Sequence, residues 1–343
     1  MPRDARSKLS YSNLFSKDIA IDLGTANTLI WVKGQGIMIN EPSIVAKTVN
    51  SDKIIAVGNE AHEMLGKTHH DLETIRPLKD GVIADFQMAD EMIQGFIRKM
   101  HLSRIARPRM VICIPSGVTP VEQRAVRESA ERANAREVHL IEEPVAAAIG
   151  IGLDIAKPVG NMIVDVGGGT TEIAIIALNG VVAMEAIRVA GDEMDAAIVD
   201  WFHNEHKLEV GYRTAEKIKC SVGTGISFGD SRILIKGRDL VSGIPKTISV
   251  PPEEIRKALS DTLFQIISAM KRALERTPPE LSSDILDRGI VLTGGGSMLK
   301  GLDEIFREET NLPVHLAEEP LTSVVMGTGM ALENIKTYAA VLF

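Results

Sequence analysis

The chain has 343 residues, of which 45% are hydrophobic and 24% charged, so it is long enough to bury two cores and is expected to form two lobes. Its net charge of -8 and its pI near 5.6 argue against nucleic acid as the main partner, because binding a phosphate backbone needs a basic face. It has only two cysteines, no apolar run long enough to span a bilayer and no apolar signal-peptide core, which predicts a cytoplasmic protein that does not span a membrane.

Residues 1–17 are polar, yet Tyr11, Leu14 and Phe15 recur at helical spacing among four basic residues. Such a segment is expected either to form a short helix on a membrane surface or to be a disordered tail with a few docking apolar side chains. An early proline and an early aspartate weaken the helical pattern, so both interpretations stay open.

A strand, an acid and a glycine turn come next, over residues 18–40 (DIAIDLGTANTLIWVKGQGIMIN). Asp22 stands near the end of the first predicted strand, Gly24 and Thr25 begin a turn, and a second strand leads through another turn into a third. A carboxylate beside a glycine turn with free N–H groups suits a phosphate and its metal, because the amides bind the anion and the acid binds the cation.

A minor insertion into the first lobe and a core helix follow. The pattern predicts short strands at 43–47 and 54–57, a small helix at 59–65 and the core helix at 88–99.

The stretch 98–109 (RKMHLSRIARPR) has five cationic residues and no acid. Its isolated apolar residues Leu102 and Ile105, ringed by cations, suit an anionic membrane surface, although a solvated loop fits the composition equally well. The stretch lacks aromatic side chains on which bases could stack, so the sequence gives a further argument against nucleic-acid binding.

A pair of acids ends the next predicted unit, which has strands at 110–114 and 138–141 and a helix at 120–133. Glu142 and Glu143 stand between the second strand and a helix-forming segment, where acids can cap the helix or orient a water molecule. We expect Glu142 to cap the helix, and the pattern leaves the role of Glu143 open.

Residues 161–178 (NMIVDVGGGTTEIAIIAL) repeat the first motif. IAIDLGTANTLI aligns with MIVDVGGGTTEI, which places Asp22 on Asp165 and Gly24 on Gly167, 143 residues apart. The second copy also runs into an Asn-Gly hairpin turn. Two equivalent hairpins predict a duplicated architecture in which each lobe contributes one hairpin to a shared cleft.

In the second lobe, Glu216 and Lys219 lie one helical turn apart, after a helix predicted at 192–206. They could form a surface ion pair, or they could present a carboxylate and an ammonium group to one polar ligand.

A third glycine turn, at 294–297, follows a strand predicted at 289–292 and precedes a helix expected from Met298. A glycine turn at the N-terminus of a helix is suited to an anion or a nucleotide. The remaining elements are predicted as strands at 231–235, 246–250 and 313–316 and as helices at 252–275 and 321–335.

Taken together, the three glycine turns and the paired acids resemble the actin, sugar-kinase and heat-shock-chaperone ATPase superfamily, and within it the bacterial actins that determine rod shape. The stretches that carry the resemblance are AIDLGTANTLIWVKGQGI, IRPLKDGVIADF, IEEPVAAAIG, VDVGGGTTEIA, TAEKIK, TPPELSSDI and VLTGGGSMLKGLD. The resemblance implies an α/β fold with two duplicated lobes, each a mixed sheet flanked by helices, and a nucleotide in the cleft between them. It implies four subdomains: IA (1–35, 78–146 and 314–343), IB (36–77), IIA (147–182 and 244–313) and IIB (183–243).

The resemblance also implies a role for each site residue. Asp22 and Asp165 would hold Mg²⁺, and Glu143 would orient the attacking water with help from Thr170. The phosphate loops would be Gly24, Thr25, Ala26 and Asn27, and Gly167, Gly168, Gly169 and Thr170. The nucleoside would be held by Glu216, Lys217, Ile218 and Lys219, and by the turn Gly294, Gly295, Gly296 and Ser297. Leu102 and Ile105 would enter the membrane.

The resemblance implies that the protein is a filament-forming cytoskeletal ATPase, which hydrolyses ATP or GTP as it polymerises. Its partners would be further copies of itself, the anionic inner face of the cell membrane, and membrane proteins of cell elongation and peptidoglycan synthesis. A small-molecule kinase of the same fold is the main alternative, but it would carry an acceptor pocket and a further catalytic carboxylate. A chaperone ATPase is less favoured because the chain leaves little room for a peptide-binding domain. A dinucleotide oxidoreductase is least favoured, because its glycine fingerprint would open a helix, whereas the glycines here flank hairpin strands in two copies.

Overall fold

Two five-stranded sheets organise the computed structural model, which describes residues 17–100, 107–222 and 232–343. The first sheet contains β1 (Ile19–Leu23), β2 (Asn27–Val32), β3 (Gly36–Pro42), β9 (Arg109–Ile114) and β10 (Glu137–Glu142). The second contains β11 (Asn161–Val166), β12 (Thr171–Ala177), β13 (Gly180–Ile187), β17 (Ile290–Thr293) and β18 (Val314–Leu316).

The two sheets have the same topology. Their strand orders are β10-β9-β1-β2-β3 and β18-β17-β11-β12-β13. In each, the first strand of the glycine hairpin pairs antiparallel with its hairpin partner and parallel with a later strand, β9 or β17. The duplication predicted from the repeated motif is therefore confirmed in the pairing of the strands.

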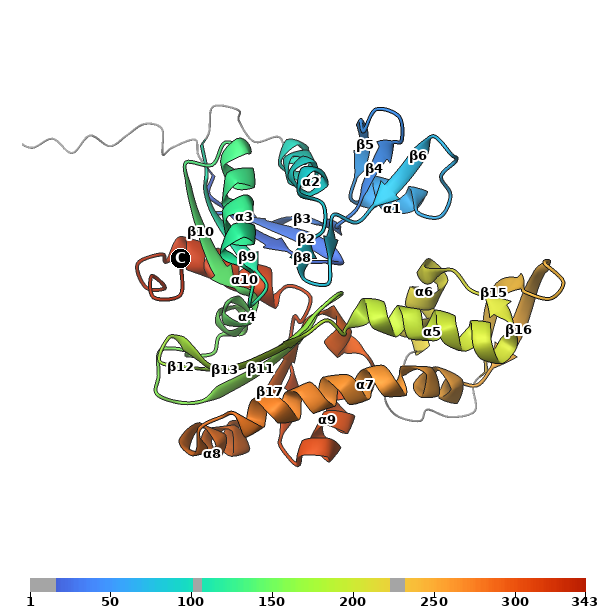
Figure 1. Cartoon of the computed structure of the whole chain (residues 1–343). Coiled ribbons are helices and arrows are strands. Elements are labelled where there is room, and N and C mark those ends of the chain that lie inside the picture. Colours follow the sequence, from blue (N-terminus) through green and yellow to red (C-terminus); the bar gives the residue numbers. More distant parts are fainter. Residues whose placement is uncertain (1–16, 101–106, 223–231) are drawn as a thin grey trace, which may run out of the picture.

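Helices cover both faces of each sheet (Figure 1). The outer face of the first sheet packs on α2 (Phe86–Lys99) and α3 (Pro120–Arg132), and that of the second on α7 (Pro252–Glu275) and α9 (Leu302–Thr310). Between the sheets lie α4 (Glu143–Ile151) and α10 (Ser323–Glu333). Side chains alternate along each strand, so Ile19 and Ile21 face the outer helices while Ala20 faces the shared layer.

The shared layer depends on two glycines. A Cβ atom on Gly150 of α4 would lie 1.9 Å from the Ser323 carbonyl oxygen, and one on Gly327 of α10 would lie 1.8 Å from the Ala146 carbonyl oxygen. Because no side chain fits at either position, the two helix backbones touch where they cross. This contact sets how closely the two sheets approach.

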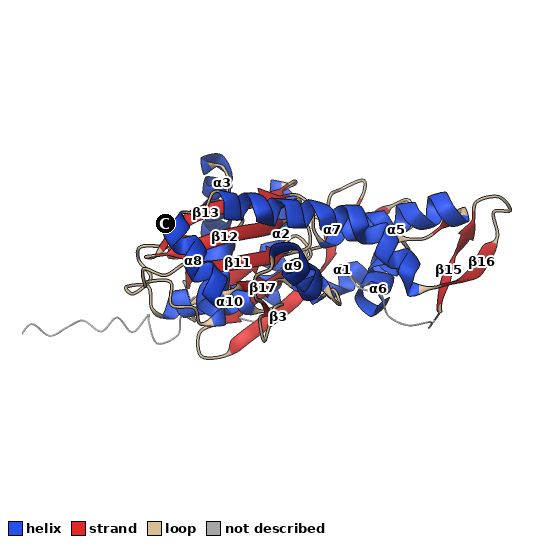
Figure 2. Cartoon of the chain, turned by 90° about the horizontal axis from the view of Figure 1, so that it is seen from below, coloured by secondary structure: helices blue, strands red, loops and turns tan. Residues whose placement is uncertain are grey.

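Two smaller units extend the lobes on the side of the cleft. One contains β4 (Val45–Thr48), β5 (Ile54–Val57), α1 (Asn59–Met64) and β6 (Leu72–Ile75), with the strand order β5-β4-β6. The other contains α5 (Gly191–His206), β14 (Leu208–Glu209), α6 (Tyr212–Val222), β15 (Ile233–Asp239) and β16 (Pro245–Val250), with the order β14-β15-β16. From below, β15 and β16 lie at one end of the molecule and the C-terminus lies toward the other (Figure 2).

The predicted subdomain division stays a prediction, but two of its boundaries cut through paired strands. β3 begins at the boundary at 36 and pairs with β2, and β16 begins beyond the boundary at 243 and pairs with β15. Among the residues that the structure describes, no helix is both long enough and apolar enough to cross a membrane.

The elements expected at 54–57 and 252–275 are confirmed at both ends, whereas α8 (Pro279–Arg288) was not predicted. The proline pair after α7 indicated only the end of a helix, but Pro279 is also the first residue of the next one, where its missing N–H costs nothing. The short hairpin of β7 (Leu78–Lys79) and β8 (Val82–Ile83) was not predicted either.

The helix expected from Met298 is wrong. The glycine turn itself forms a 3₁₀ helix, η2 (Gly295–Met298), and α9 begins at Leu302. Gly301 has a φ of 79°, in the left-handed region, so a right-handed α-helix can start only after it.

The glycine contact between α4 and α10 yields a prediction for stability. Gly327→Ala is expected to lower the free energy of unfolding by about 3 kcal/mol, because its Cβ atom would overlap the Ala146 carbonyl oxygen and the helices would have to separate. Gly211→Ala is the matched control, because nothing lies within 4 Å of the Cβ position there. Chemical denaturation measures both, and equal midpoints for the two variants would contradict the proposed role of the crossing.

Candidate functional site

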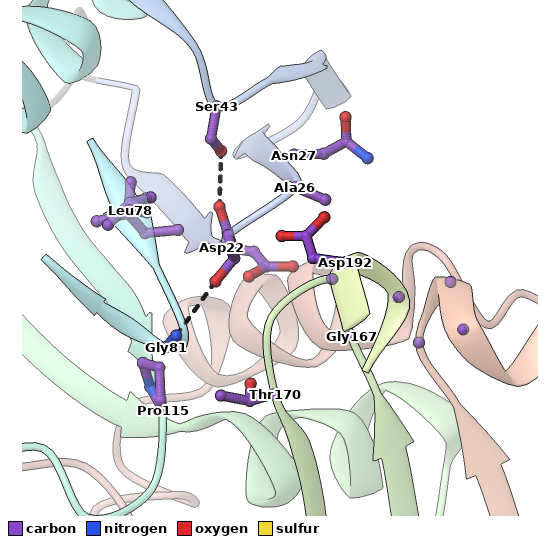
Figure 3. A pocket seen from close by; sticks show the side chains of 18 of the residues that line it. Asp22, Ala26, Asn27, Ser43, Leu78, Gly81, Pro115, Gly167, Thr170 and Asp192 are labelled. Carbon is purple, nitrogen blue, oxygen red and sulfur yellow. Dashed lines mark hydrogen bonds between the residues drawn. The ribbon is translucent and has the colours of Figure 1, made fainter. Parts of the chain in front are cut away.

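A cavity of about 490 Å³ lies between the two glycine hairpins, and both lobes line it (Figure 3). Most of the residues that the sequence predicted as a site meet here. Those lining the cavity are Asp22, Gly24, Thr25, Ala26, Asn27, Glu143, Asp165, Gly167, Gly168, Thr170, Glu216, Lys219, Gly294, Gly295 and Gly296. The predicted residues Gly169, Lys217, Ile218 and Ser297 are not among the lining residues, and Leu102 and Ile105 lie outside the described residues.

The two hairpin turns touch across the cavity. A Cβ atom on Gly168 would lie 2.7 Å from the Cβ atom of Ala26, and one on Gly169 would lie 2.9 Å from Cγ2 of Thr25. Glycine is required at both positions because the turns approach too closely for a side chain. Two glycine turns from different lobes therefore line one small space, an arrangement suited to a phosphate chain.

Hydrogen bonds hold the first turn in place. The Ser43 hydroxyl donates to the Gly24 carbonyl oxygen at 2.6 Å, and the Gly81 N–H donates to the Thr25 hydroxyl at 3.3 Å (Figure 3). Both partners come from segments beyond the hairpin, so the turn is positioned by its lobe as well as by its own strands.

Asp22 and Asp165 occupy equivalent places in the two hairpins. Burial raises the pKa of each to about 7, and the charge of Asp165 adds to the rise for Asp22. Asp165 is only 6% exposed, so its ionised form is costly without a counter-ion. Two carboxylates at the base of a phosphate-sized cavity form an oxygen donor set that fits a hard divalent cation such as Mg²⁺.

Glu143 is the first residue of α4 and lines the same cavity. Burial raises its pKa well above the usual value, and the charges of Glu172, Asp22 and Asp165 raise it further, in that order. Thr170, in the turn of the second hairpin, lines the same cavity. A carboxyl group and a hydroxyl group are thus available to orient a water molecule beside the phosphate space.

The expectation that Glu142 caps α4 is wrong. Glu142 occupies the N-cap position, but its side chain makes no capping hydrogen bond. Pro144, the second residue of the helix, has no N–H to donate, which removes one of the two amides that a capping side chain normally accepts from.

Lys219 has a partner that the sequence did not indicate. Its ammonium group donates to Oδ2 of Asp195 at 2.9 Å and to the Gly191 carbonyl oxygen at 2.8 Å, and so ties α6 to the start of α5. Burial raises the pKa of Asp195 to about 6, although Lys219 acts in the opposite direction. Glu216 lines the cavity, whereas Lys217 is exposed and Ile218 is buried in the lobe core.

The third glycine turn closes the site from the side of β17. Gly294 has a φ of 81°, and a Cβ atom on it would lie 2.2 Å from Oδ1 of Asp165, so the turn packs directly on one of the predicted metal ligands. The Ser297 hydroxyl donates to the Gly294 carbonyl oxygen at 2.6 Å. Ser297 is 4% exposed and stabilises the turn from behind.

Sequence reasoning missed three charged residues. Arg76 and Asp192 form an ion pair of 3.2 Å between the lobes, and both line the cavity. Glu172 of β12 is 1% exposed, and its pKa is raised to about 8 by burial and then by the charge of Asp165. One signal was available for Glu172, since it is the only charged residue in the strand TEIAIIA.

The duplicated sheets, the facing glycine turns and the paired acids at the base of the cleft define an actin-like protein. More narrowly, the chain belongs to the MreB/Mbl family, because the family model described as MreB/Mbl protein matches residues 16–340. The resemblance drawn from the motifs is thereby confirmed.

Individual relatives agree with this assignment. The chain is 50% identical over 326 residues to the cell shape-determining protein Mbl of Bacillus subtilis, covering 94% of this chain and 97% of the relative. It is 49% identical over 340 residues to the cell shape-determining protein MreB of Escherichia coli K12, covering 97% and 98%. The family is therefore one of cell shape-determining proteins.

Solved structures agree as well. Crystal structures of MreB5 of Spiroplasma citri, one bound to AMPPNP and one bound to ADP, match with a TM-score of 0.90 and 37% identity over 94% of this chain and 98% of theirs. The MamK double helical filament matches with a TM-score of 0.79 and 20% identity over 93% and 99%, which supports the fold.

The raised pKa values of the cleft acids predict how stability depends on pH. Between the ordinary aspartate pKa near 4 and about 7, the folded protein binds protons that the unfolded chain has lost, so its stability falls as pH rises through this window. In metal-free buffer we expect the free energy of unfolding to fall by about 5 kcal/mol between about pH 5 and pH 8 from these two groups. Asp22→Asn should flatten the fall, and a dependence as steep in the variant as in the wild type would contradict the assignment.

Proposed function

We propose that this chain binds ATP with Mg²⁺ in the interlobe cleft, hydrolyses the γ-phosphate and assembles into filaments beneath the cell membrane. The observation that carries the proposal is the pair of equivalent acid and glycine hairpins that meet across one cavity, with Glu143 at its base. The solved MreB5 structures support the choice of nucleotide, because one contains AMPPNP and the other ADP.

The phosphates would lie between the two turns, which line the cavity from both lobes. Asp22 and Asp165 would hold Mg²⁺, and the bound ion would supply charge neutralisation for the phosphates. The cation also explains how two buried carboxylates are tolerated side by side, since it would stabilise their ionised forms.

Glu143 and Thr170 would orient the attacking water. Phosphoryl transfer needs a positioned nucleophile and charge stabilisation more than covalent catalysis, so a carboxylate and a hydroxyl group at the edge of the phosphate space are sufficient. Glu143 stands at the N-terminus of α4, in a helix fixed by its contact with α10, so its backbone position is rigid.

The nucleoside would lie between Glu216 and the turn Gly294–Gly296, because these residues line the part of the cavity formed by the second lobe. Lys219 would act indirectly, because its ion pair with Asp195 holds α6 against α5. The positions of Lys217 and Ile218, one exposed and one in the core, support no direct contact with the ligand.

A small-molecule kinase remains the second candidate, since the same cleft can transfer a phosphoryl group to another acceptor. Family membership favours the filament, because the relatives that match over nearly their whole length are cell shape-determining proteins. On the same basis, we propose that the filaments help to organise peptidoglycan synthesis through membrane proteins of cell elongation.

Glu143→Ala tests the hydrolytic role. We expect a decrease in kcat for phosphate release of about a hundredfold, with the dissociation constant for ATP nearly unchanged, because the variant loses the group that orients water and keeps the phosphate cradle. The measurements are phosphate release and binding of a fluorescent ATP analogue, alongside pelleting of filaments with Mg-ATP.

The neighbouring half-buried acid provides a matched control. Glu142→Ala removes a carboxylate one residue away that does not line the cavity, and should keep wild-type hydrolysis. Equal loss of binding and hydrolysis in Glu143→Ala would make Glu143 structural. A wild-type protein that stays in the supernatant with Mg-ATP yet phosphorylates a sugar would favour the kinase.

The membrane association rests on sequence alone. Leu102→Ser combined with Ile105→Ser is expected to reduce co-sedimentation with anionic liposomes severalfold, because it removes the apolar side chains and leaves the five surrounding cations in place. Neutral liposomes serve as the lipid control. Unchanged pelleting of the double variant would remove this segment from the proposal.

A further inference from the structure

A partly buried hydrogen bond joins the two lobes beside the cleft. Ser116 belongs to the turn that follows β9 of the first sheet, and Glu172 belongs to β12 of the second. The Ser116 N–H donates to Oε1 of Glu172 at 2.9 Å, and Glu172 is only 1% exposed. A partly buried backbone N–H of one lobe therefore donates to a buried carboxylate of the other.

Each of these residues also has a buried polar side-chain atom without a hydrogen-bond partner among the described residues. These atoms are the Ser116 hydroxyl oxygen and Oε2 of Glu172. The Ser116 hydroxyl lies close enough to Glu172 to lower the pKa of that carboxyl group, although the two groups do not form a well-oriented hydrogen bond. Buried polar groups are rarely left unpaired, so this pair of atoms is suited to one enclosed water molecule between the lobes.

Glu172 lies next to the proposed hydrolytic residues. It follows Thr170 by two positions, and β12 begins at Thr171 between them. Its charge is the largest neighbouring contribution to the raised pKa of Glu143, so the two carboxyl groups are close.

Thr170 itself is held from the opposite lobe. A Cβ atom on Gly81 would lie 2.6 Å from Cγ2 of Thr170, so the β7–β8 turn of the first lobe packs tightly on the threonine. The position of Thr170 relative to Glu143 therefore depends on how the second hairpin lies against the first lobe, and the bond between Ser116 and Glu172 is a polar contact between the lobes beside this site.

We propose that Glu172 is a positioning residue for hydrolysis. By accepting a hydrogen bond from the Ser116 N–H, it holds the second hairpin against the first lobe. Thr170 and Glu143 thereby keep the relative positions that orient the attacking water. The inference rests on the proposed ATPase function and adds to it a condition, that hydrolysis is fast only while the lobes are closed at this point. Glu172 touches neither the nucleotide nor the attacking water in this role.

The test compares Glu172→Gln with Glu172→Ala in the full chain. Glutamine keeps a carbonyl oxygen that accepts from Ser116, so kcat for phosphate release should stay within about threefold of the wild type; alanine leaves the N–H unpaired, and kcat should fall about tenfold, with KM for ATP changed less than about twofold. Hydrogen exchange at the Ser116 amide should be fast in Glu172→Ala and as slow as in the wild type in Glu172→Gln.

A control separates positioning from loss of stability. Glu185 of the adjacent strand β13 is mostly buried and pairs with Arg272 and Arg276, so Glu185→Ala destabilises the same sheet away from the cleft. It should lower the unfolding midpoint and leave kcat per folded molecule unchanged.

Two outcomes would overturn the inference. Wild-type kcat in Glu172→Ala would show that the contact does not position the site, and a glutamine variant as slow as the alanine variant would show that the charge of Glu172, rather than its hydrogen bond, matters. A wild-type protein that releases no phosphate would instead refute the proposed function, and the exchange of the Ser116 amide would still report whether the two lobes are joined there.

Discussion

The crossing of α4 and α10 is the contact on which the rest of the structure depends. Gly150 and Gly327 let the two backbones touch, and because α4 packs on both sheets and α10 on the first, this distance sets how far apart the lobes lie. Glu143 stands at the first residue of α4, so the same contact that joins the lobes places a carboxyl group between them. The site is built at the junction of the lobes for this reason, and its geometry depends on parts of the fold well away from the cavity.

The cleft brings together four acidic side chains whose ionised forms are costly without a counter-charge. Asp22, Glu143, Asp165 and Glu172 all have raised pKa values, and burial is the largest cause in each case. An arrangement of this kind is stabilising only when something else supplies positive charge or takes up the protons. The ionised acids are therefore tolerated in the folded protein only when a counter-charge lies nearby, so the stability of the cleft depends on this electrostatic balance.

The duplicated hairpins have diverged in what they offer. Both provide an acid and a glycine turn, but only the second continues with Thr170 and Glu172, and only the first is followed closely by a side chain, Ala26, that fills the space left by Gly168 of the other. One lobe supplies α4 and Glu143, and the other supplies the hydroxyl. The symmetry of the fold thus provides two facing glycine turns with an acid each, and the departures from symmetry provide the carboxyl and hydroxyl groups that the proposed hydrolysis would use.

By itself, the sequence determined the hairpins, the acids and the three glycine turns, because each is a local pattern: an apolar strand, a polar residue and glycines that only a tight turn requires. It also determined the family, since those patterns recur in a specific order. The contacts of Lys219 with Asp195, of Ser116 with Glu172 and of Arg76 with Asp192 were decided only by the tertiary structure. Each joins residues far apart in the chain, and nothing local distinguishes a charged residue that will be buried against a distant partner from one that will face solvent.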